Sequence, residues 1–410
     1  MRRILVFIIF LVCLRSGATS IHIGSGFAFN SIQTALISCN DGDSLIVHPG
    51  HYLEHNIIIN KRIFFIGIDY PVLDGEDQFE VVSIKHDSVI MSGFEIRNSG
   101  RSSIRDLAGI KIYDSNYVTI SNNRLRNTFF GIYTQFGKHC IIRNNDLEGP
   151  GGEEQQCGNG VHCWKCDSML IISNVVHHHR DGIYFEFVTN SVIWRNETFQ
   201  NIRYGLHFMF SNHDLYVTNF FHENGAGVAV MFSHHVNMYN NYFEDNWGDS
   251  AYGILLKEIS DGQIEGNTFE SNTTGIFMEG ASRIRMHRNK FLNNGWGLKI
   301  QASCMEIELK SCDFKGNSFD VATNGSLVLN SFEGNYWDNY EGYDLNKDHV
   351  GDIPYRPVSM YSYVVEQNPS AMLLFRSLIT TVMDKSEKIV PSLTPVDLKD
   401  AFPLMQSVLI

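Results

Sequence analysis

Short stretches in which apolar and polar residues alternate cover most of this chain, and polar or glycine-containing segments separate them. Alternation with a period of two predicts β-strands, because successive side chains of a strand point to opposite faces. A glycine followed by Ile, Val or Leu recurs at intervals of 22, 29, 22, 23, 22, 26, 22 and 22 residues. These glycines are Gly109, Gly131, Gly160, Gly182, Gly205, Gly227, Gly253, Gly275 and Gly297. So regular an interval indicates a solenoid in which each repeat is one coil.

Asparagine repeats in step with glycine. Fourteen residues after each of the first eight glycines stand Asn123, Asn145, Asn174, Asn196, Asn219, Asn241, Asn267 and Asn289. The ninth place is Ser311, where we expect the column to end. A coil of about 22 residues accommodates three short strands and three turns, and coils stack about 4.8 Å apart. Stacked asparagine amides can hydrogen-bond between coils, and glycine permits a positive φ or a close backbone approach. The sequence therefore predicts an all-β, right-handed parallel β-helix.

The register also assigns side chains to the core or the surface. Residues one and three after the glycine, such as Ile183 and Phe185, are apolar and are expected to point inward. A second inward column lies eleven residues after the glycine and includes Met238 and Met286, which we interpret as core residues. Residues two and four after the glycine are expected to point outward.

The N-terminal part differs from the repeat. Arg2 and Arg3 precede an apolar run over Ile4–Leu14, which is too short to span a bilayer comfortably and is typical of a signal peptide, predicted over residues 1–18. Residues 19–108 are expected to form an N-terminal cap and irregular first coils. Within them, Ser31–Cys39 predicts a short amphipathic helix that covers the open end of the solenoid.

Residues 109–325 are predicted to form the regular coils, with Glu148–Gly158 and Asn246–Ala251 as surface loops that account for the longer intervals. Residues 326–410 are expected to hold a C-terminal cap, a polar loop and an amphipathic helix of about 18 residues after Pro369. That helix is interpreted as a second cap, as a contact with a partner, or as both.

Composition narrows the classes of partner. The chain has 410 residues and a net charge of −13, a balance that repels nucleic acid. Removal of the signal peptide leaves seven cysteines with irregular spacing, which does not indicate a disulfide framework.

Two outward columns carry unusual side chains. His162, Tyr184 and His207 stand two residues after successive glycines, and Met209 and Met231 stand four residues after adjacent ones. His213 and His235, with His234 beside the latter, form a further column eight residues after the glycine. Thioether and imidazole ligands suit Cu(I). We therefore predict a copper site from His207, Met209, Met231, His213 and His235. Surface decoration and a protein-docking patch are the alternatives.

Two other groups resemble metal sites. Asp344, Asn346, Asp348 and Asp352, with Gly351, present alternating oxygen donors that can wrap calcium, although a polar loop bonded to its own backbone has the same composition. The Cys157, Cys163 and Cys166 group with the histidines at 177–179 is less convincing as a site, because Cys163 occupies an inward position.

No catalytic set is evident. A polysaccharide enzyme needs two carboxylates at a set separation or a carboxylate, metal and base together. Asp181 is interpreted as a turn residue before Gly182, and no nucleophile–base pair or phosphate-binding loop has a distinctive spacing. We therefore expect that the chain is not an enzyme.

Several motifs resemble the NosD family of periplasmic maturation proteins for nitrous-oxide reductase. They are Tyr204-Gly-Leu-His-Phe-Met-Phe-Ser211, Gly225-Ala-Gly-Val-Ala-Val-Met-Phe232, Asn335-Tyr-Trp-Asp-Asn-Tyr-Glu-Gly-Tyr-Asp344 and Ile353-Pro-Tyr-Arg-Pro-Val358. The likeness extends from about Ser31 to Met405. His207, Met209 and Met231 fall inside these motifs, whereas the cysteine group does not.

The resemblance implies a β-helix of the carbohydrate-binding and sugar-hydrolase type without sugar chemistry. It also implies an exported, periplasmic protein that reaches the membrane through partners. These would be the permease and ATPase of an ABC transporter, a copper chaperone lipoprotein and nitrous-oxide reductase itself. The implied function is a scaffold that accepts copper, a sulfur species or both for the copper–sulfide cluster of the reductase. The alternatives are a polysaccharide lyase or epimerase and a passive adhesion solenoid.

Overall fold

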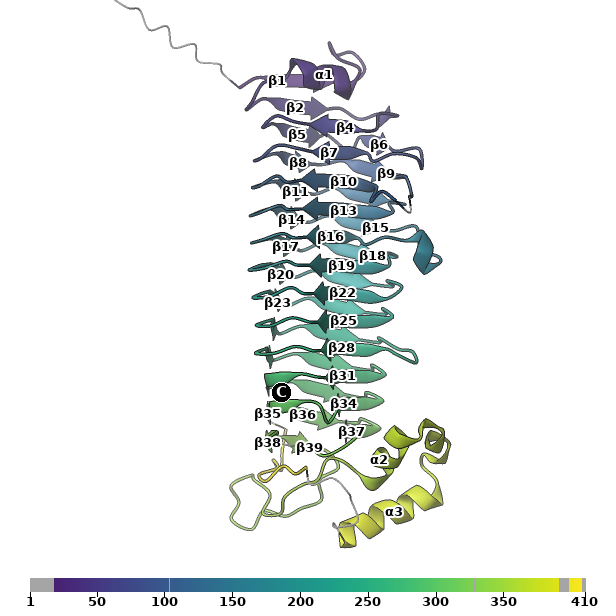
Figure 1. The fold of residues 1–410 in the computed structure, drawn as a ribbon, viewed down its shortest axis with the longest axis vertical. Coiled ribbons are helices and arrows are strands. Elements are labelled where there is room, and N and C mark those ends of the chain that lie inside the picture. Colours follow the sequence, from purple (N-terminus) through teal and green to yellow (C-terminus); the bar gives the residue numbers. More distant parts are fainter. Residues whose placement is uncertain (1–17, 103, 328, 391–397, 408–410) are drawn as a thin grey trace, which may run out of the picture.

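The computed structural model describes residues 18–102, 104–327, 329–390 and 398–407. Apart from residue 18, the predicted signal peptide lies outside the described residues. Three long parallel sheets run along one axis and make up most of the described chain (Figure 1). We call them sheets A, B and C, and the chain visits them in the order C, A, B in each coil.

The strands of sheet A are β1 (Ser20–Ile23), β2 (Ser44–Val47), β5 (Phe64–Gly67), β8 (Ile90–Ser92), β11 (Thr119–Ser121), β14 (Ile141–Arg143), β17 (Leu170–Ile172), β20 (Val192–Trp194), β23 (Leu215–Val217), β26 (Asn237–Tyr239), β29 (Gln263–Glu265), β32 (Ser282–His287), β35 (Met305–Lys310) and β38 (Ser331–Glu333). Those of sheet B are β3 (His51–Tyr52), β6 (Val72–Asp74), β9 (Glu95–Arg97), β12 (Arg124–Arg126), β15 (Asp146–Glu148), β18 (Val175–His177), β21 (Glu197–Phe199), β24 (Phe220–His222), β27 (Tyr242–Glu244), β30 (Thr268–Glu270), β33 (Lys290–Leu292), β36 (Asp313–Lys315) and β39 (Tyr336–Trp337). Those of sheet C are β4 (Ile57–Ile59), β7 (Val82–Ile84), β10 (Ala108–Tyr113), β13 (Phe130–Gln135), β16 (Val161–Trp164), β19 (Asp181–Glu186), β22 (Tyr204–Met209), β25 (Ala226–Met231), β28 (Tyr252–Lys257), β31 (Thr274–Glu279), β34 (Trp296–Ile300) and β37 (Phe319–Ala322).

The all-β parallel solenoid predicted from the repeat is confirmed. Equivalent residues of successive coils are register partners, as in Ile183 with Leu206 and Leu206 with Val228. These inward side chains are fully buried, and so are Met238 and Met286 of the second inward column. The core is therefore a stack of apolar side chains enclosed by the three sheets.

The glycine column serves close backbone approach. None of its nine members has a positive φ. A Cβ added to Gly227 would lie 2.5 Å from the carbonyl oxygen of Gly253, and one added to Gly182 would lie 2.6 Å from that of Gly205. Contacts this short exclude any side chain, so the register requires glycine here.

The asparagine ladder forms as predicted and continues further than predicted. The side-chain amide of Asn219 donates to Asn241 Oδ1 at 2.9 Å and to the backbone oxygen of Ile193 at 3.0 Å. The prediction that the column ends at Ser311 is wrong. Ser282 is the register partner of Met305, 23 residues later, so the coil between them is one residue longer than 22. The residue stacked on Asn289 is therefore Cys312 rather than Ser311. Asn289 donates to Cys312 Sγ, and the Cys312 backbone N–H donates to Asn335.

A second asparagine ladder joins sheets B and C. Its members are Asn201, Asn224, Asn246, Asn272, Asn294 and Asn317, linked from coil to coil through their side-chain amides. An aromatic stack runs inside sheet B, with ring centroids 4.3–5.2 Å apart. It consists of Phe221, Phe243, Phe269, Phe291, Phe314 and Trp337.

The N-terminal cap is α1 (Ile32–Ser38), close to its predicted position. The Ser31 hydroxyl accepts a hydrogen bond from the Thr34 backbone N–H, and Ile32 and Ala35 face the core. A capping residue of this kind satisfies an N–H group that the helix itself leaves unpaired.

The prediction of one C-terminal amphipathic helix of about 18 residues is wrong. After Pro369 the chain forms a 3₁₀ turn (Pro369–Leu374) and the 12-residue helix α3 (Leu378–Ile389), and another helix, α2 (Met360–Gln367), precedes them. Arg376 has a φ of 60°, and the Ser377 hydroxyl accepts from the Thr380 backbone N–H, so a new helix begins there. Tyr361 and Val365 of α2 pack against Trp296 and Phe319 at the end of sheet C.

Candidate metal centre

The outer face of sheet C carries a row of stacked rings on three coils. His162 on β16, Tyr184 on β19 and His207 on β22 are register partners, with ring centroids 4.8 Å apart at each step. They point away from the core, as the register predicts, but they are almost fully covered, and His207 is only 5% exposed. The rings of Phe130 and Tyr133 pack against His162, and that of Tyr204 packs against His207.

A buried carboxylate lies beside His207. Asp181, the first residue of β19, is fully buried and pairs with the Arg203 guanidinium through two bonds of 3.0 Å. Its Oδ2 is 3.4 Å from His207 Nδ1. Burial by itself raises the pKa of Asp181, but the hydrogen bond to His207 and the charge of Arg203 outweigh it and lower that pKa. The interpretation of Asp181 as a plain turn residue is therefore wrong, because it begins strand β19 and Arg203 and His207 keep it charged and paired despite its burial.

The loop predicted over Glu148–Gly158 contributes to this arrangement. It contains the short 3₁₀ turn Glu154–Gln156, and Glu154 Oε1 lies 3.2 Å from Arg203 Nη1. Arg203 thus bridges the loop and the buried Asp181. The loop holds Arg203 in place on the outer face.

The two predicted thioether ligands lie side by side. Met209 and Met231 end β22 and β25 and are register partners, each half-buried. The Tyr184 hydroxyl donates to Met209 Sδ at 3.6 Å, so Tyr184 joins the sulfur to the row of rings. Glu186 and Lys257 flank the pair on the coils on either side.

His207 is the buried imidazole of this face. Its Nδ1 lies 3.4 Å from both Asp181 Oδ2 and Arg203 Nη2. When Nδ1 carries the proton and faces Asp181, the lone pair is on Nε2. That Nε2 is buried and has no hydrogen-bond partner among the described residues. A carboxylate behind a histidine orients the ring and makes it a better metal ligand. Imidazole and thioether donors of this kind suit Cu(I), and copper binding by His207, Met209 and Met231 stays a prediction.

The structure separates the five predicted copper ligands into two groups. β22 ends at Met209, and the turn that follows carries His213 beyond the edge of sheet C, where His234 and His235 of the next coil lie beside it. His207 is not among the side chains whose ligand atoms converge there. Strand spacing alone could not reveal this division, because the turn changes the direction of the chain.

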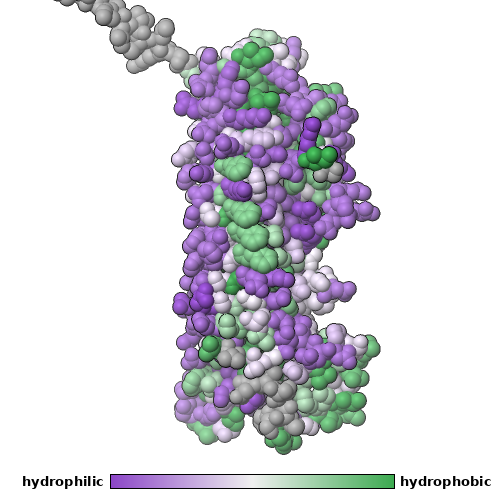
Figure 2. All heavy atoms as spheres, in the orientation of Figure 1, coloured by the Kyte–Doolittle hydropathy of each residue, from purple (hydrophilic) through white to green (hydrophobic). Residues whose placement is uncertain are grey.

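An exposed aromatic column adjoins both groups. In Figure 2 a narrow apolar stripe runs along the middle of the visible face. Phe187, Phe210 and Phe232 supply such a stripe, with ring centroids 5.2 Å apart and exposed fractions of 39–44%. All three have φ values of 51–54°, a left-handed conformation that is unusual for a bulky side chain.

The predicted calcium loop is bonded to its own backbone. Asp344 accepts from the N–H groups of Lys347 and His349 at 2.6 and 2.9 Å, and Asp352 accepts from Leu345 at 2.7 Å. Asn346 donates to Asp348 at 2.9 Å. These bonds match the alternative of a polar loop, and calcium binding stays a prediction.

Cys163 and Cys166 share a side-chain hydrogen bond, but among the described residues the cysteines do not form a group of three or more converging ligands. All seven cysteines in the described part of the chain are free and buried, and Cys163 faces the core as its register predicts. Cys157 Sγ lies 3.1 Å from the Gly151 oxygen. His177 and His178 instead meet Glu148 on the outer face of sheet B.

Among the helices that the structure describes, none combines the length and the apolar character that a membrane-spanning helix needs.

The three stacked sheets define a parallel β-helix protein. Residues 148–342 match the family described as "Periplasmic copper-binding protein (NosD)". The chain is 26% identical over 385 residues to the "Probable ABC transporter binding protein NosD" of Pseudomonas aeruginosa, covering 89% of each chain. It is 26% identical over 306 residues to the protein of the same name from Stutzerimonas stutzeri, covering 70% of this chain and 69% of that one. The resemblance to NosD that the motifs predicted is confirmed by this family match and by these two relatives.

Solved structures agree on the fold. The A-module of the Azotobacter vinelandii mannuronan C-5 epimerase AlgE6 aligns with a TM-score of 0.52 and 12% identity, covering 74% of this chain and 87% of the module. The Dettilon tailspike protein aligns with a TM-score of 0.57 and 13% identity, covering 69% of this chain and 62% of that one. Identities this low extend the likeness to the β-helix alone.

Proposed function

We propose that this chain is a periplasmic accessory protein that receives copper and presents it for assembly of the copper–sulfide cluster of nitrous-oxide reductase. Copper is its cargo, and His207, Met209 and Met231 are the ligands that accept it. The chain is a binding scaffold rather than an enzyme. A sulfur species is a second candidate cargo for the same role.

The observation that carries this proposal is the buried, unpartnered Nε2 of His207. A buried imidazole nitrogen without a hydrogen bond costs free energy and calls for an explanation, and a ligand that supplies the missing partner is one. Asp181 orients the ring from behind, and two register-paired thioethers lie on the same face. The description of the matching family as copper-binding supports the choice of metal.

The partners follow from the relatives. Those named NosD are called ABC transporter binding proteins, and we extend to this chain an association with the transporter's permease and ATPase. A copper chaperone lipoprotein would deliver the ion, and the reductase would receive it. α3 leaves Leu378, Ile379 and Ile389 largely exposed, and we assign this helix to the contact with the permease. The chain would then reach the membrane through its partner.

A Cu(I) titration against a chromogenic chelator tests the site. We expect the wild-type chain to bind one Cu(I) that the His207→Ala/Met209→Ala/Met231→Ala variant does not bind. Because the triple change removes a buried ring, a second variant, Met209→Leu/Met231→Leu, keeps the volume and removes only the sulfurs. It should weaken Cu(I) binding at least tenfold.

The matched control is Met238→Leu, a thioether in the inward column that should not touch copper. Equal Cu(I) affinity in the wild type and in both site variants would refute the site. So would a loss of affinity in the Met238→Leu variant as large as that in the Met209→Leu/Met231→Leu variant.

A polysaccharide lyase or epimerase is the second candidate, because Asp181, His207 and Tyr184 together could exchange protons with a substrate. The near-complete burial of His207 argues against access by a polymer. Turnover of uronate polymers by the purified chain, lost in the His207→Ala variant, would favour the enzyme over the scaffold.

A further inference from the structure

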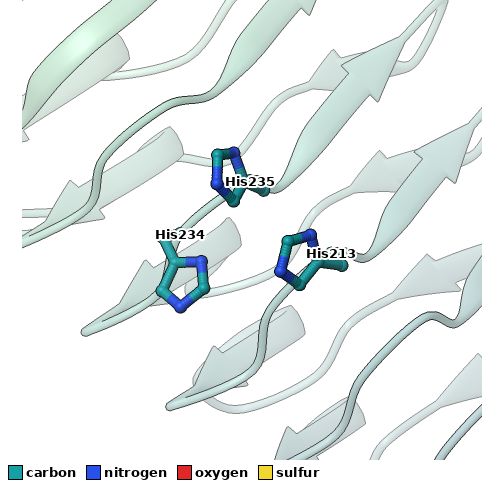
Figure 3. A group of neighbouring side chains, drawn as sticks. All are labelled: His213, His234 and His235. Atoms are coloured by element: carbon teal, nitrogen blue, oxygen red, sulfur yellow. The ribbon is translucent and has the colours of Figure 1, made fainter.

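Three imidazoles meet on the turn between sheets C and A. His213 follows β22, and His234 and His235 follow β25 one coil further along. One ring nitrogen from each lies within 4.8 Å of the other two, and all three side chains are exposed. Figure 3 shows the three rings arranged around a common space. The rings of His213 and His235 stack with centroids 4.8 Å apart, and His234 is edge-on to both.

The backbone fixes where these side chains start. His213 and His235 occupy the same left-handed turn position on adjacent coils, with φ values of 59° and 54°. The His213 N–H donates to the His234 oxygen, and the His234 N–H donates to Asn212 Oδ1 at 2.8 Å. Histidine is common in left-handed turns, so His213 and His235 alone indicate only a turn. His234 is different, because it completes a converging set without occupying that turn position.

We propose that His213, His234 and His235 form a second, surface metal site with three imidazole ligands for Cu(II) or Zn(II). Imidazole suits both ions, and all three converging side chains are imidazoles. Tetrahedral coordination with bonds of about 2.0 Å places ligand nitrogens ~3.3 Å apart. The exposed rings reach that spacing by small side-chain rotations. Three protein ligands leave a fourth position open, so the ion can exchange with a partner's ligand.

One carboxylate, that of Asp261, lies close to the three imidazoles. Asp261 is next in the turn column but is engaged by Arg283 through two contacts of 2.6 and 2.8 Å. The imidazoles are therefore the available ligands at this point of the turn.

The test is a titration of the full chain with Cu(II) and, separately, with Zn(II), each against a competing chelator. The variant His213→Asn/His234→Ala/His235→Asn removes the imidazoles while asparagine keeps the left-handed turns. We expect it to bind one ion fewer per chain, or the same ion at least tenfold more weakly. Electron paramagnetic resonance of the Cu(II) form should show coupling to imidazole nitrogen in the wild type and lose it in the variant.

The matched control is His139→Asn, which changes a histidine at the same turn position three coils earlier, where its ring stacks on Tyr117. It should bind both ions like the wild type. Equal uptake by the wild type and the triple variant would overturn the proposal, as would an equal loss in His139→Asn. The outcome is independent of the buried site, because the Met209→Leu/Met231→Leu variant should keep its Cu(II) and Zn(II) binding while its Cu(I) binding falls.

Discussion

The corner between sheets A and B and the corner between sheets C and A belong to the same coils, yet they use their turn residues in opposite ways. At the first corner every coil from Asn123 to Asn289 offers a buried asparagine that bonds to the next. At the second corner the residues change from coil to coil, and Phe210, His213, Phe232 and His235 are exposed in left-handed backbone. We infer that a column with the same buried residue in every coil stabilises the stack of coils. A column whose exposed residues differ from coil to coil is available for binding.

The asparagine ladder should carry the largest stability effect. Asn219→Ala removes the acceptor of two Asn196 N–H groups and leaves the Ile193 oxygen without its donor. We expect a loss of about 3–5 kcal/mol in the free energy of unfolding, because several buried polar groups lose partners together. Urea denaturation followed by circular dichroism measures it.

The control lies one residue away. Thr218→Asn, at an exposed left-handed position with a φ of 54°, should change stability by less than ~0.5 kcal/mol. Similar losses in the free energy of unfolding from Asn219→Ala and Thr218→Asn would contradict the idea that the buried ladder, unlike the exposed turn residues, stabilises the coils.

Asp320, at the end of the glycine column, should make the free energy of unfolding depend on pH. Asp320 takes the place after Gly297, and burial, followed by the charge of Asp338, raises its pKa to about 7. The folded chain therefore prefers the neutral acid, so this stability is complete below about pH 4 and is lost as pH rises towards 7. Asp320→Asn should remove that loss, which is at most about 4 kcal/mol at pH 8 for a shift of about three units. Parallel stability–pH curves for the wild type and the variant would contradict it.

The exposed phenylalanines should matter least for stability. Phe210→Asn/Phe232→Asn exchanges two bulky residues for one that tolerates left-handed backbone, so relief of strain offsets the lost ring stacking. We expect a change below ~1 kcal/mol by thermal denaturation. A loss above ~2 kcal/mol would mean that the aromatic column holds the coils together, and the comparison of the two corners would fail.

Local pattern explains which features could be predicted. The 22-residue interval and the alternation around Ile183 and Phe185 are properties of neighbouring residues, so coil length and facing could be inferred before any contact was known. The second asparagine ladder had a signal as clear, since Asn201 and Asn224 each stand nineteen residues after a glycine of the column. It was missed because the first ladder already accounted for the repeat.

The candidate site was only half predictable. His207, Met209 and Met231 follow from the register, but Asp181 was missed, because Arg203, its ion-pair partner, lies in another coil. The single C-terminal helix was wrong because apolar spacing does not show where a residue such as Arg376 turns the chain.

The sequence by itself determined the coil, its length and the side chains that enter the core, because strand alternation is local and stacking repeats it in every coil. Only the tertiary structure decided that His207 is covered and paired, that the glycines serve close approach, and that His234 joins His213 and His235. The physical reason is that burial and convergence depend on atoms from neighbouring coils and on the direction of each turn, which no single stretch of sequence contains.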